Sequence, residues 1–224
     1  MKRIKLKERV LPTYTKGEEI FNMVSHIVGA SLGLIFMILC LIFAIIHKNG
    51  YGIVSAIIYG VTMIMLYTMS SIYHGLKPDT TSKKVFQVID HCTIFLLIAG
   101  SYTPFALCTF RQYDSLLGWG IFVFIWAMAI IGVVLNSIDL RRYRVFSMVC
   151  YIAMGWCIVI KASLLPQLLG TTGVALLVAG GLAYTIGTIF YGLGRKIKYF
   201  HSIFHLFIVL GTILQFFCIL MYVM

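Results

Sequence analysis

Seven long apolar stretches follow one another along the chain, and they restrict what it can fold into. Each has about 20 residues or more, enough for a helix to cross a hydrocarbon core of roughly 30 Å. In lipid every backbone polar group must be satisfied internally, so such stretches predict helices. The predicted spans are residues 20–46, 52–75, 86–109, 116–137, 145–165, 172–193 and 200–223.

The composition excludes an ordinary soluble globule. Hydrophobic residues make up 61% of the 224 residues and charged residues only 11%, whereas a soluble domain carries roughly 25% charged residues. We therefore predict an all-α, polytopic membrane protein with seven transmembrane helices. A basic N-terminal segment (1–19) would precede one seven-helix transmembrane domain (20–224), and we expect a multi-pass integral protein of the plasma (inner) membrane.

The positive charge follows the membrane topology. The net charge is +11, but lysines and arginines are confined to the loops and form no basic face with aromatic residues. We therefore expect no nucleic-acid partner. Fifteen of them lie in residues 1–19, 76–85, 138–144 and 194–199, and three, Lys48, Arg111 and Lys161, lie at the alternate loops. The positive-inside rule then predicts a cytoplasmic N-terminus and a C-terminus outside.

Four ionisable residues are expected at one depth of the membrane. His74 ends the second span, Asp90 opens the third, and His201 and His205 begin the seventh. The spacing of the last two, i and i+4, points both side chains the same way. Ionisable groups inside a bilayer are costly, so a cluster indicates a functional site. Imidazoles with a carboxylate suggest a metal, and zinc first.

Three other histidines have different expectations. His47, beside Lys48, is typical of a solvated loop residue. His91 follows Asp90 and points about 100° away around the helix, so we expect it to pack or to face lipid headgroups. His26 is either a ligand or a hydrogen-bonding residue between helices. The sequence leaves the roles of His26 and His91 open.

Several of these residues form a known pattern. Ser70 and His74 fit S-x3-H in the second span, Asp90 fits the aspartate of the third, and His201 and His205 fit H-x3-H in the seventh. The first span adds Glu19-x-x-Asn22-x-x-Ser25-His26-x-x-Gly29. This pattern resembles the seven-helix progestin and adiponectin Q receptor family, in its bacterial hemolysin III branch. The resemblance covers essentially the whole chain.

The resemblance implies a zinc ion held by His74, His201 and His205. Water would fill the fourth position, placed by Asp90 as general base with Ser70 nearby. Around these ligands, supporting roles would fall to Glu19, Asn22 and His26. The related alkaline ceramidases share the S-x3-H, D, H-x3-H pattern and cleave lipid amides. The resemblance thus implies a zinc-dependent hydrolase of a lipid amide or ester, with membrane lipids as substrate or ligand.

Two other classes of function stay open at this point. One is a non-enzymatic membrane protein, either a pore-forming or cytolytic hemolysin or a sensor of membrane lipids. The other is a fold that needs zinc only for its structure. A conduction path would need charges or carbonyls along its length, whereas the ionisable residues here gather at one end, which favours a site. Catalysis, substrate and oligomeric state are not decided by the sequence.

Overall fold

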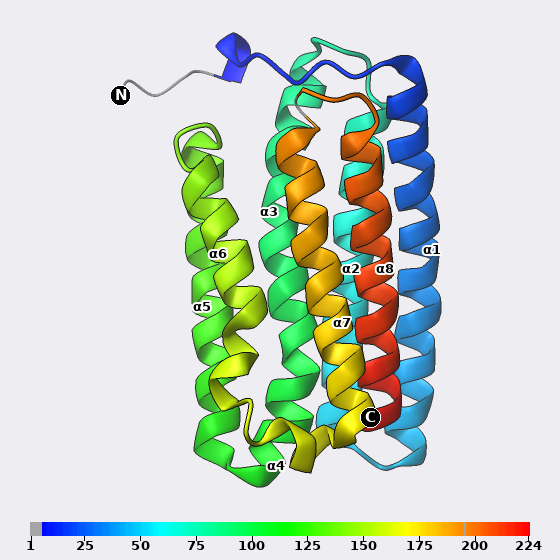
Figure 1. The fold of residues 1–224 in the computed structure, drawn as a ribbon, viewed down its shortest axis with the longest axis vertical. Helices are drawn as coiled ribbons and strands as arrows, with labels where there is room; N and C mark the ends of the chain where they lie inside the picture. Colours follow the sequence, from blue (N-terminus) through cyan, green and yellow to red (C-terminus); the bar gives the residue numbers. More distant parts are fainter. Residues whose placement is uncertain (1–5, 195) are drawn as a thin grey trace.

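The computed structural model describes residues 6–194 and 196–224, and every regular element in this part of the chain is helical (Figure 1). Seven helical segments are long and apolar enough to cross a membrane. After a short turn, η1 (Leu6–Glu8), they are α1 (Lys16–Ile46), α2 (Gly50–Gly75), α3 (Thr81–Pro104) continued by η2 (Phe105–Phe110) and α4 (Arg111–Tyr113), α5 (Ser115–Asp139), α6 (Arg144–Trp156) continued by η3 (Cys157–Lys161), α7 (Leu165–Leu193) and α8 (Phe200–Tyr222). The prediction of an all-α, seven-span, multi-pass integral membrane protein is confirmed.

The helices form a bundle with one looser flank. α1 packs on α2 and α8, α8 packs on α7, and α2 packs on α3. The α5–α6 hairpin lies beside this group and contacts it mainly through α3. The N-terminal segment crosses the end of the bundle that carries the loops after α2, α5 and α7, and the C-terminus lies at the opposite end (Figure 1).

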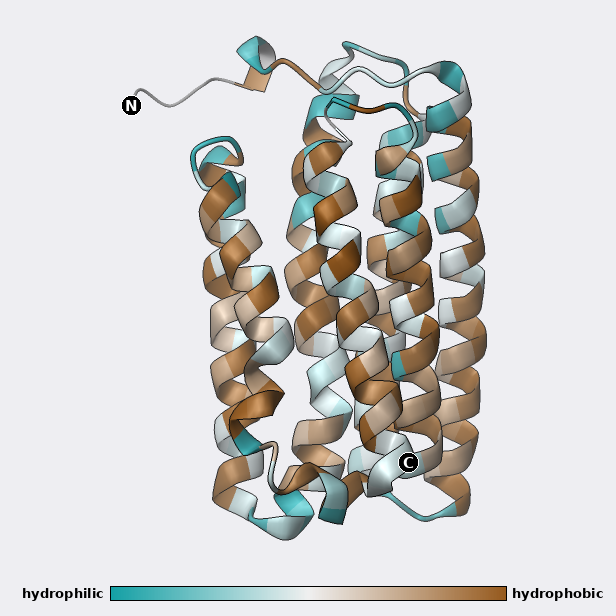
Figure 2. Cartoon of the chain, in the orientation of Figure 1, coloured by the Kyte–Doolittle hydropathy of each residue, from teal (hydrophilic) through white to brown (hydrophobic). Residues whose placement is uncertain are grey.

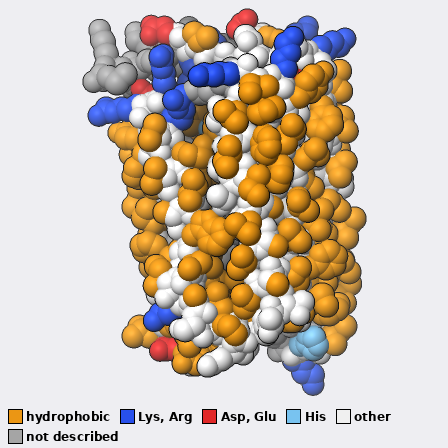
Figure 3. All heavy atoms as spheres, in the orientation of Figure 1, with side chains coloured by type: hydrophobic (Ala, Val, Ile, Leu, Met, Phe, Trp, Pro, Cys, Tyr) orange, Lys and Arg blue, Asp and Glu red, His pale blue; other side chains and the backbone are white. Residues whose placement is uncertain are grey.

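The distribution of hydrophobic and charged residues on the surface matches the pattern of apolar spans and basic loops in the sequence. Hydrophobic residues cover the middle of the bundle and hydrophilic residues mark its two ends (Figure 2). Most visible lysines and arginines gather at the end that carries the N-terminal segment (Figure 3). Lys2, Arg3, Lys5 and Arg195 lie outside the described residues. The assignment of the basic end to the cytoplasm stays a prediction.

Two helices begin earlier than predicted because polar residues cap them. α1 starts at Lys16 because Thr15 accepts a hydrogen bond from the Glu18 N–H (3.3 Å) while the Glu18 carboxylate accepts one from the Thr15 N–H (2.8 Å). α3 starts at Thr81, five residues before the predicted span, after Thr80 as N-cap. The division into residues 1–19 and 20–224 stays a prediction, with α1 reaching across its boundary.

The boundary between the fifth and sixth spans also differs from the prediction. The fifth span ends at Lys161, and α7 begins at Leu165 with Pro166 in its first turn, where a missing N–H leaves no helical bond unmade. Gly170 then breaks the helix with φ 66° and ψ 170°. Residues with a β-carbon rarely adopt this backbone, so the predicted start at residue 172 corresponds to the point where the helix resumes.

A close contact between α1 and α2 sets one wall of the site. A β-carbon on Gly29 would lie 2.5 Å from a ring carbon of Tyr67, so only glycine allows this approach. The Tyr67 hydroxyl shares a hydrogen bond with the Thr212 hydroxyl of α8 (2.7 Å). His26, one turn before Gly29, meets the Tyr67 ring edge-on at 5.0 Å between centroids. Tyr67 therefore fixes α1 and α8 beside each other next to His26.

Candidate metal centre

Three buried histidines converge at the basic end of the bundle. His201 and His205 occupy the first two turns of α8, and His74 comes from the last turn of α2. Each offers one ring nitrogen, and these nitrogens lie within 4.8 Å of one another. The Nε2 atoms of His201 and His205 are 3.0 Å apart. The structure thus brings the three predicted ligands together as a group that could hold a metal ion.

The hydrogen bonds of His74 fit such an ion. Its Nδ1–H donates to Glu19 Oε2 at 2.6 Å, whereas its Nε2 is buried and has no hydrogen-bond partner among the described residues. An unsatisfied buried nitrogen is costly, and a bound cation would use its lone pair. A metal-binding histidine normally gives its other nitrogen to a carboxylate, which is the place Glu19 takes. The donor set therefore suits a metal that prefers nitrogen ligands.

Glu19 is itself held by a buried lysine that the sequence analysis missed. Lys83 donates from Nζ to Glu19 Oε1 (2.7 Å) and to the Leu76 carbonyl (3.0 Å). Its side chain is only 2% exposed. One carboxylate oxygen thus faces His74 and the other faces Lys83, so the ion pair fixes the orientation of the His74 ring. A lysine just before an apolar span is usually solvated and is interpreted as a marker of membrane topology. The sequence therefore gives no reason to expect this contact.

Two of the predicted supporting residues lie beside the histidines without visible partners. His26 stacks on His205, with 3.8 Å between ring centroids and 21° between planes. Within the described part of the chain, neither nitrogen of His26 has a hydrogen-bond partner, and the same holds for the amide of Asn22, which is fully buried. The structure places His26 against His205 of the three-histidine group. The supporting roles of both residues stay a prediction.

The N-terminal segment adds a tyrosine that the sequence did not single out. The ring of Tyr14 stacks on His201, with 4.8 Å between centroids and 22° between planes, and lies 5.7 Å from the His74 ring. Burial raises the pKa of Tyr14 well above its ordinary value, so its hydroxyl keeps its proton at neutral pH. Tyr14 precedes the first span in a basic segment, where side chains are usually solvated, so the sequence gives no signal of this contact. It covers the histidines from the polar side.

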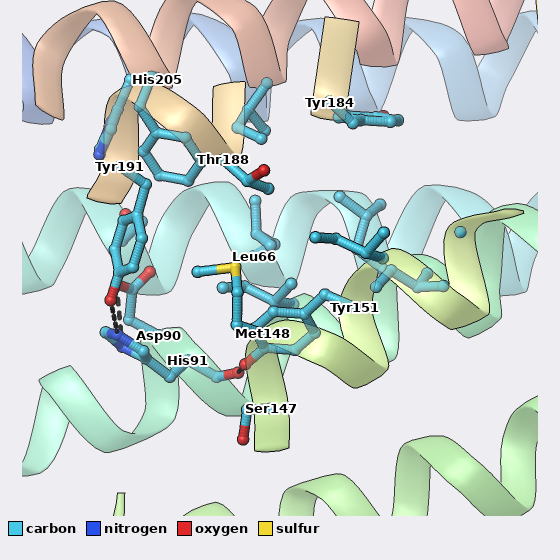
Figure 4. Close-up of a pocket in the computed structure, with 18 of the residues that line it drawn as sticks. Leu66, Asp90, His91, Ser147, Met148, Tyr151, Tyr184, Thr188, Tyr191 and His205 are labelled. Carbon is cyan, nitrogen blue, oxygen red and sulfur yellow. Dashed lines mark hydrogen bonds and ion pairs between the residues drawn. The ribbon is translucent and has the colours of Figure 1, made fainter. Parts of the chain in front are cut away.

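Asp90 lies between two and three turns from the start of α3, further along its helix than predicted, because α3 begins at Thr81. Ser70 is in hydrogen-bonding contact with its carboxyl group. His91 is not part of the three-histidine group, but it faces the cavity: its Nδ1 bonds the Gln87 carbonyl (2.8 Å) and lies 3.8 Å from Asp90 Oδ2, and its Nε2 and the Tyr191 hydroxyl share a hydrogen bond of 3.1 Å (Figure 4). His91 and Tyr191 are thus additional polar groups of the site.

A cavity of about 790 Å³ connects these groups. Asp90, His91, Tyr191 and His205 gather at one end of it, and Tyr184 lies toward the other (Figure 4). The remaining wall is largely apolar and includes Leu97, Ile98, Phe105, Ile158 and Leu177. Binding pockets for organic ligands usually have about 300–1,000 Å³ and a few polar groups on apolar walls. His201, His205 and Asp90 therefore share one cavity of a size that admits an organic ligand.

The wall contributed by α6 is anchored at the level of Asp90. The Tyr151 hydroxyl donates to the carbonyl of His91 (2.8 Å), and Ser147 donates to Asn136 Oδ1 (2.6 Å). The Asn136 amide in turn donates toward Tyr151 (3.3 Å). This network ties α5 and α6 to α3, so the polar end of the cavity has a fixed shape.

Sequence comparisons identify the family of the chain. A model of the haemolysin-III related family matches residues 14–216. Hemolysin-3 from Bacillus cereus is 40% identical over 207 residues, which cover 92% of each chain. The Hemolysin-3 homolog of Bacillus subtilis (strain 168) is 36% identical over 209 residues (93% of this chain and 96% of the relative). The human monocyte to macrophage differentiation factor is 27% identical over 187 residues (80% and 76%). From the family match and these identities, the chain belongs to the haemolysin-III related family.

Proposed function

We propose that this protein is a membrane-embedded, zinc-dependent hydrolase of long-chain lipid amides or esters. The observation that carries the proposal is that three buried histidines, His74, His201 and His205, meet beside a largely apolar cavity that also contains Asp90. Three protein ligands with an open position are the arrangement of catalytic zinc sites. When bound, zinc supplies an activated water and polarises the carbonyl of the substrate.

Asp90 carries out the proton transfers of the proposed reaction. Asp90 accepts the proton of the attacking water as general base, and Ser70, its hydrogen-bonding neighbour, orients the carboxylate. Water adds to the carbonyl carbon, the C–N or C–O bond breaks, and Asp90 returns the proton to the leaving amine or alcohol. The products are a free fatty acid and an amine or alcohol, so atoms and charge balance.

The surrounding residues hold the ligands and limit water access. Glu19 orients His74 through the hydrogen bond to Nδ1. His26 packs flat against His205, and Asn22 precedes it by one turn of α1. Tyr14, protonated and partly buried, covers His201 on the side of the N-terminal segment. The partners are membrane lipids, because the apolar walls of the cavity suit a long acyl chain.

A second candidate function comes from the name of one relative. Hemolysin-3 from Bacillus cereus favours a cytolytic or pore-forming activity without hydrolysis. The clustering of ionisable residues at one end of the bundle favours the hydrolase, because a conducting pore needs polar groups along its whole path.

The test combines zinc analysis with lipid mass spectrometry on the purified full-length protein. Wild type, Asp90→Asn and the control His47→Ala should each carry about one zinc per chain, and His205→Ala should lose it, because His205 is one of only three protein ligands. Fatty-acid release should fall about 10²- to 10⁴-fold in Asp90→Asn, whose carboxamide cannot accept the proton. His47 bonds the Met224 carbonyl at the opposite end of the bundle, so its variant should behave as wild type.

Two results would remove the proposal. One is full zinc content in His205→Ala. The other is equal fatty-acid release from wild type and Asp90→Asn with every lipid tested. If, in addition, ion flux or lysis follows reconstitution into vesicles, the cytolytic function replaces the hydrolase.

A further inference from the structure

The cavity has a second set of polar groups that the proposed hydrolysis does not use. Arg9, Arg141 and Arg144 all line it. Arg9 belongs to the N-terminal segment, Arg141 to the turn after α5, and Arg144 is the first residue of α6. We call these three residues the arginine cluster. The N-terminal segment and the turn between α5 and α6 both lie at the end of the bundle where basic side chains gather (Figures 1 and 3).

Arg9 is the member with an unmet hydrogen bond. Its Nη1 atom is shielded from solvent and has no hydrogen-bond partner among the described residues. Burial lowers the pKa of Arg9 and the nearby charge of Asp139 opposes this shift, but a guanidinium keeps its proton in proteins. Asp139 already accepts hydrogen bonds from the backbone N–H groups of Arg141 and Arg142, both at 3.1 Å. Arg9 therefore brings a charged, unsatisfied donor to the cavity wall.

The arginine cluster and the histidines share the cavity with one pair of side chains, because His91 and Tyr191 line the same cavity as Arg9 and Arg144. His91 and Tyr191 are hydrogen-bonded to each other. The Tyr191 ring is 5.9 Å from the His201 ring, measured between centroids. A ligand in this part of the cavity can therefore approach the cluster and the histidines together.

We propose that the arginine cluster binds the phosphate group of an anionic membrane lipid whose acyl chain lies in the cavity. Guanidinium groups bind phosphate oxygens through two parallel hydrogen bonds, and a phosphate would satisfy the buried Nη1 of Arg9. In a glycerophospholipid the acyl esters lie only a few bonds from the phosphate. A phosphate at the cluster thus brings an ester toward the histidines, while the chain extends along Leu97, Ile98 and Leu177.

The proposal rests on the proposed hydrolase only for what happens to the ester; the binding itself requires no turnover. It therefore narrows the substrate class to lipids with an anionic phosphate headgroup. A zwitterionic lipid with the same acyl chains carries a compensating positive charge next to the phosphate, and the arginine cluster repels that charge. We expect selection between the two headgroups rather than between chains.

Native mass spectrometry of the full-length protein in detergent tests the binding. The probes are phosphatidylglycerol and phosphatidylcholine with identical chains, and inorganic phosphate as a competitor. Wild type should prefer phosphatidylglycerol, and Arg9→Gln and Arg144→Gln should each weaken its binding about fivefold. The matched control is Arg142→Gln: Arg142 lies in the same turn but outside the cavity wall, with its guanidinium over the Tyr143 ring. This variant should retain the preference.

Three results would overturn the inference: equal affinity for the two lipids, an equal loss in Arg142→Gln, or full displacement of the lipid by inorganic phosphate. Unfolding temperatures and zinc content of all variants must match wild type, and Arg144→Gln at the exposed start of α6 serves if Arg9→Gln does not fold. Failure of the hydrolase is a separate outcome, seen as selective binding without fatty-acid release. Equal, arginine-independent hydrolysis of both lipids would refute only the present inference.

Discussion

Glu19 is the residue on which the orientation of His74 depends most directly. One oxygen of its carboxylate accepts a hydrogen bond from His74 Nδ1 and the other accepts one from Lys83 Nζ. A glutamine has only one acceptor oxygen, so it cannot keep both hydrogen bonds. We expect Glu19→Gln to weaken zinc binding about 10- to 100-fold, the usual effect of removing such a partner. Competition with a chromophoric chelator measures this. Glu8→Gln, at an exposed position of η1, is the control, and equal affinity in the two variants would contradict the role of Glu19.

The residues of the site differ in how well the sequence predicts them. The sequence singles out His74, His201, His205 and Asp90, because an ionisable group in an apolar span is energetically costly and therefore indicates a function. Tyr14 and Lys83 do not stand out, since they lie in polar segments where solvent is the normal environment. Their burial comes from the N-terminal segment folding across the bundle end and from α3 starting at Thr81. Both are tertiary effects without a local signal.

At the scale of the elements, α7 offers the sharpest test because its break depends on one residue. Gly170 adopts φ 66° and ψ 170°, a region essentially restricted to glycine, so Gly170→Ala should lower the free energy of unfolding by about 1–3 kcal/mol. Gly192→Ala, in the regular part of α7 with open space around its Cα, should leave stability unchanged or raise it by up to about 1 kcal/mol. Reversible unfolding in mixed micelles compares them. Equal stability changes would show that the break does not require Gly170.

The elements themselves were largely predictable. Hydrophobic length gives all seven spans because a helix must match the bilayer, and the ends of α2 and α8 fall within a few residues of the prediction. The early starts of α1 and α3 follow from Thr15 and Thr80 caps that lie outside the apolar runs. Helix ends are thus set by local hydrogen bonds, which hydropathy does not report.

For the whole molecule, the consequential prediction is its orientation in the membrane. Fifteen of the eighteen lysines and arginines belong to the N-terminal segment and the loops after the second, fourth and sixth spans, so we expect the N-terminus in the cytoplasm and the C-terminus outside. A phosphatase fused after Met224 should be active only when exported, and a fluorescent protein fused before Met1 should fluoresce inside the cell. Activity of the C-terminal fusion only in the cytoplasm would contradict the expected orientation.

Because the histidines and the arginine cluster lie at the same basic end, the expected orientation also means that the lipid enters from the cytoplasmic leaflet. Fatty-acid release should then require the anionic lipid in that leaflet, which asymmetric vesicles with oriented protein can measure.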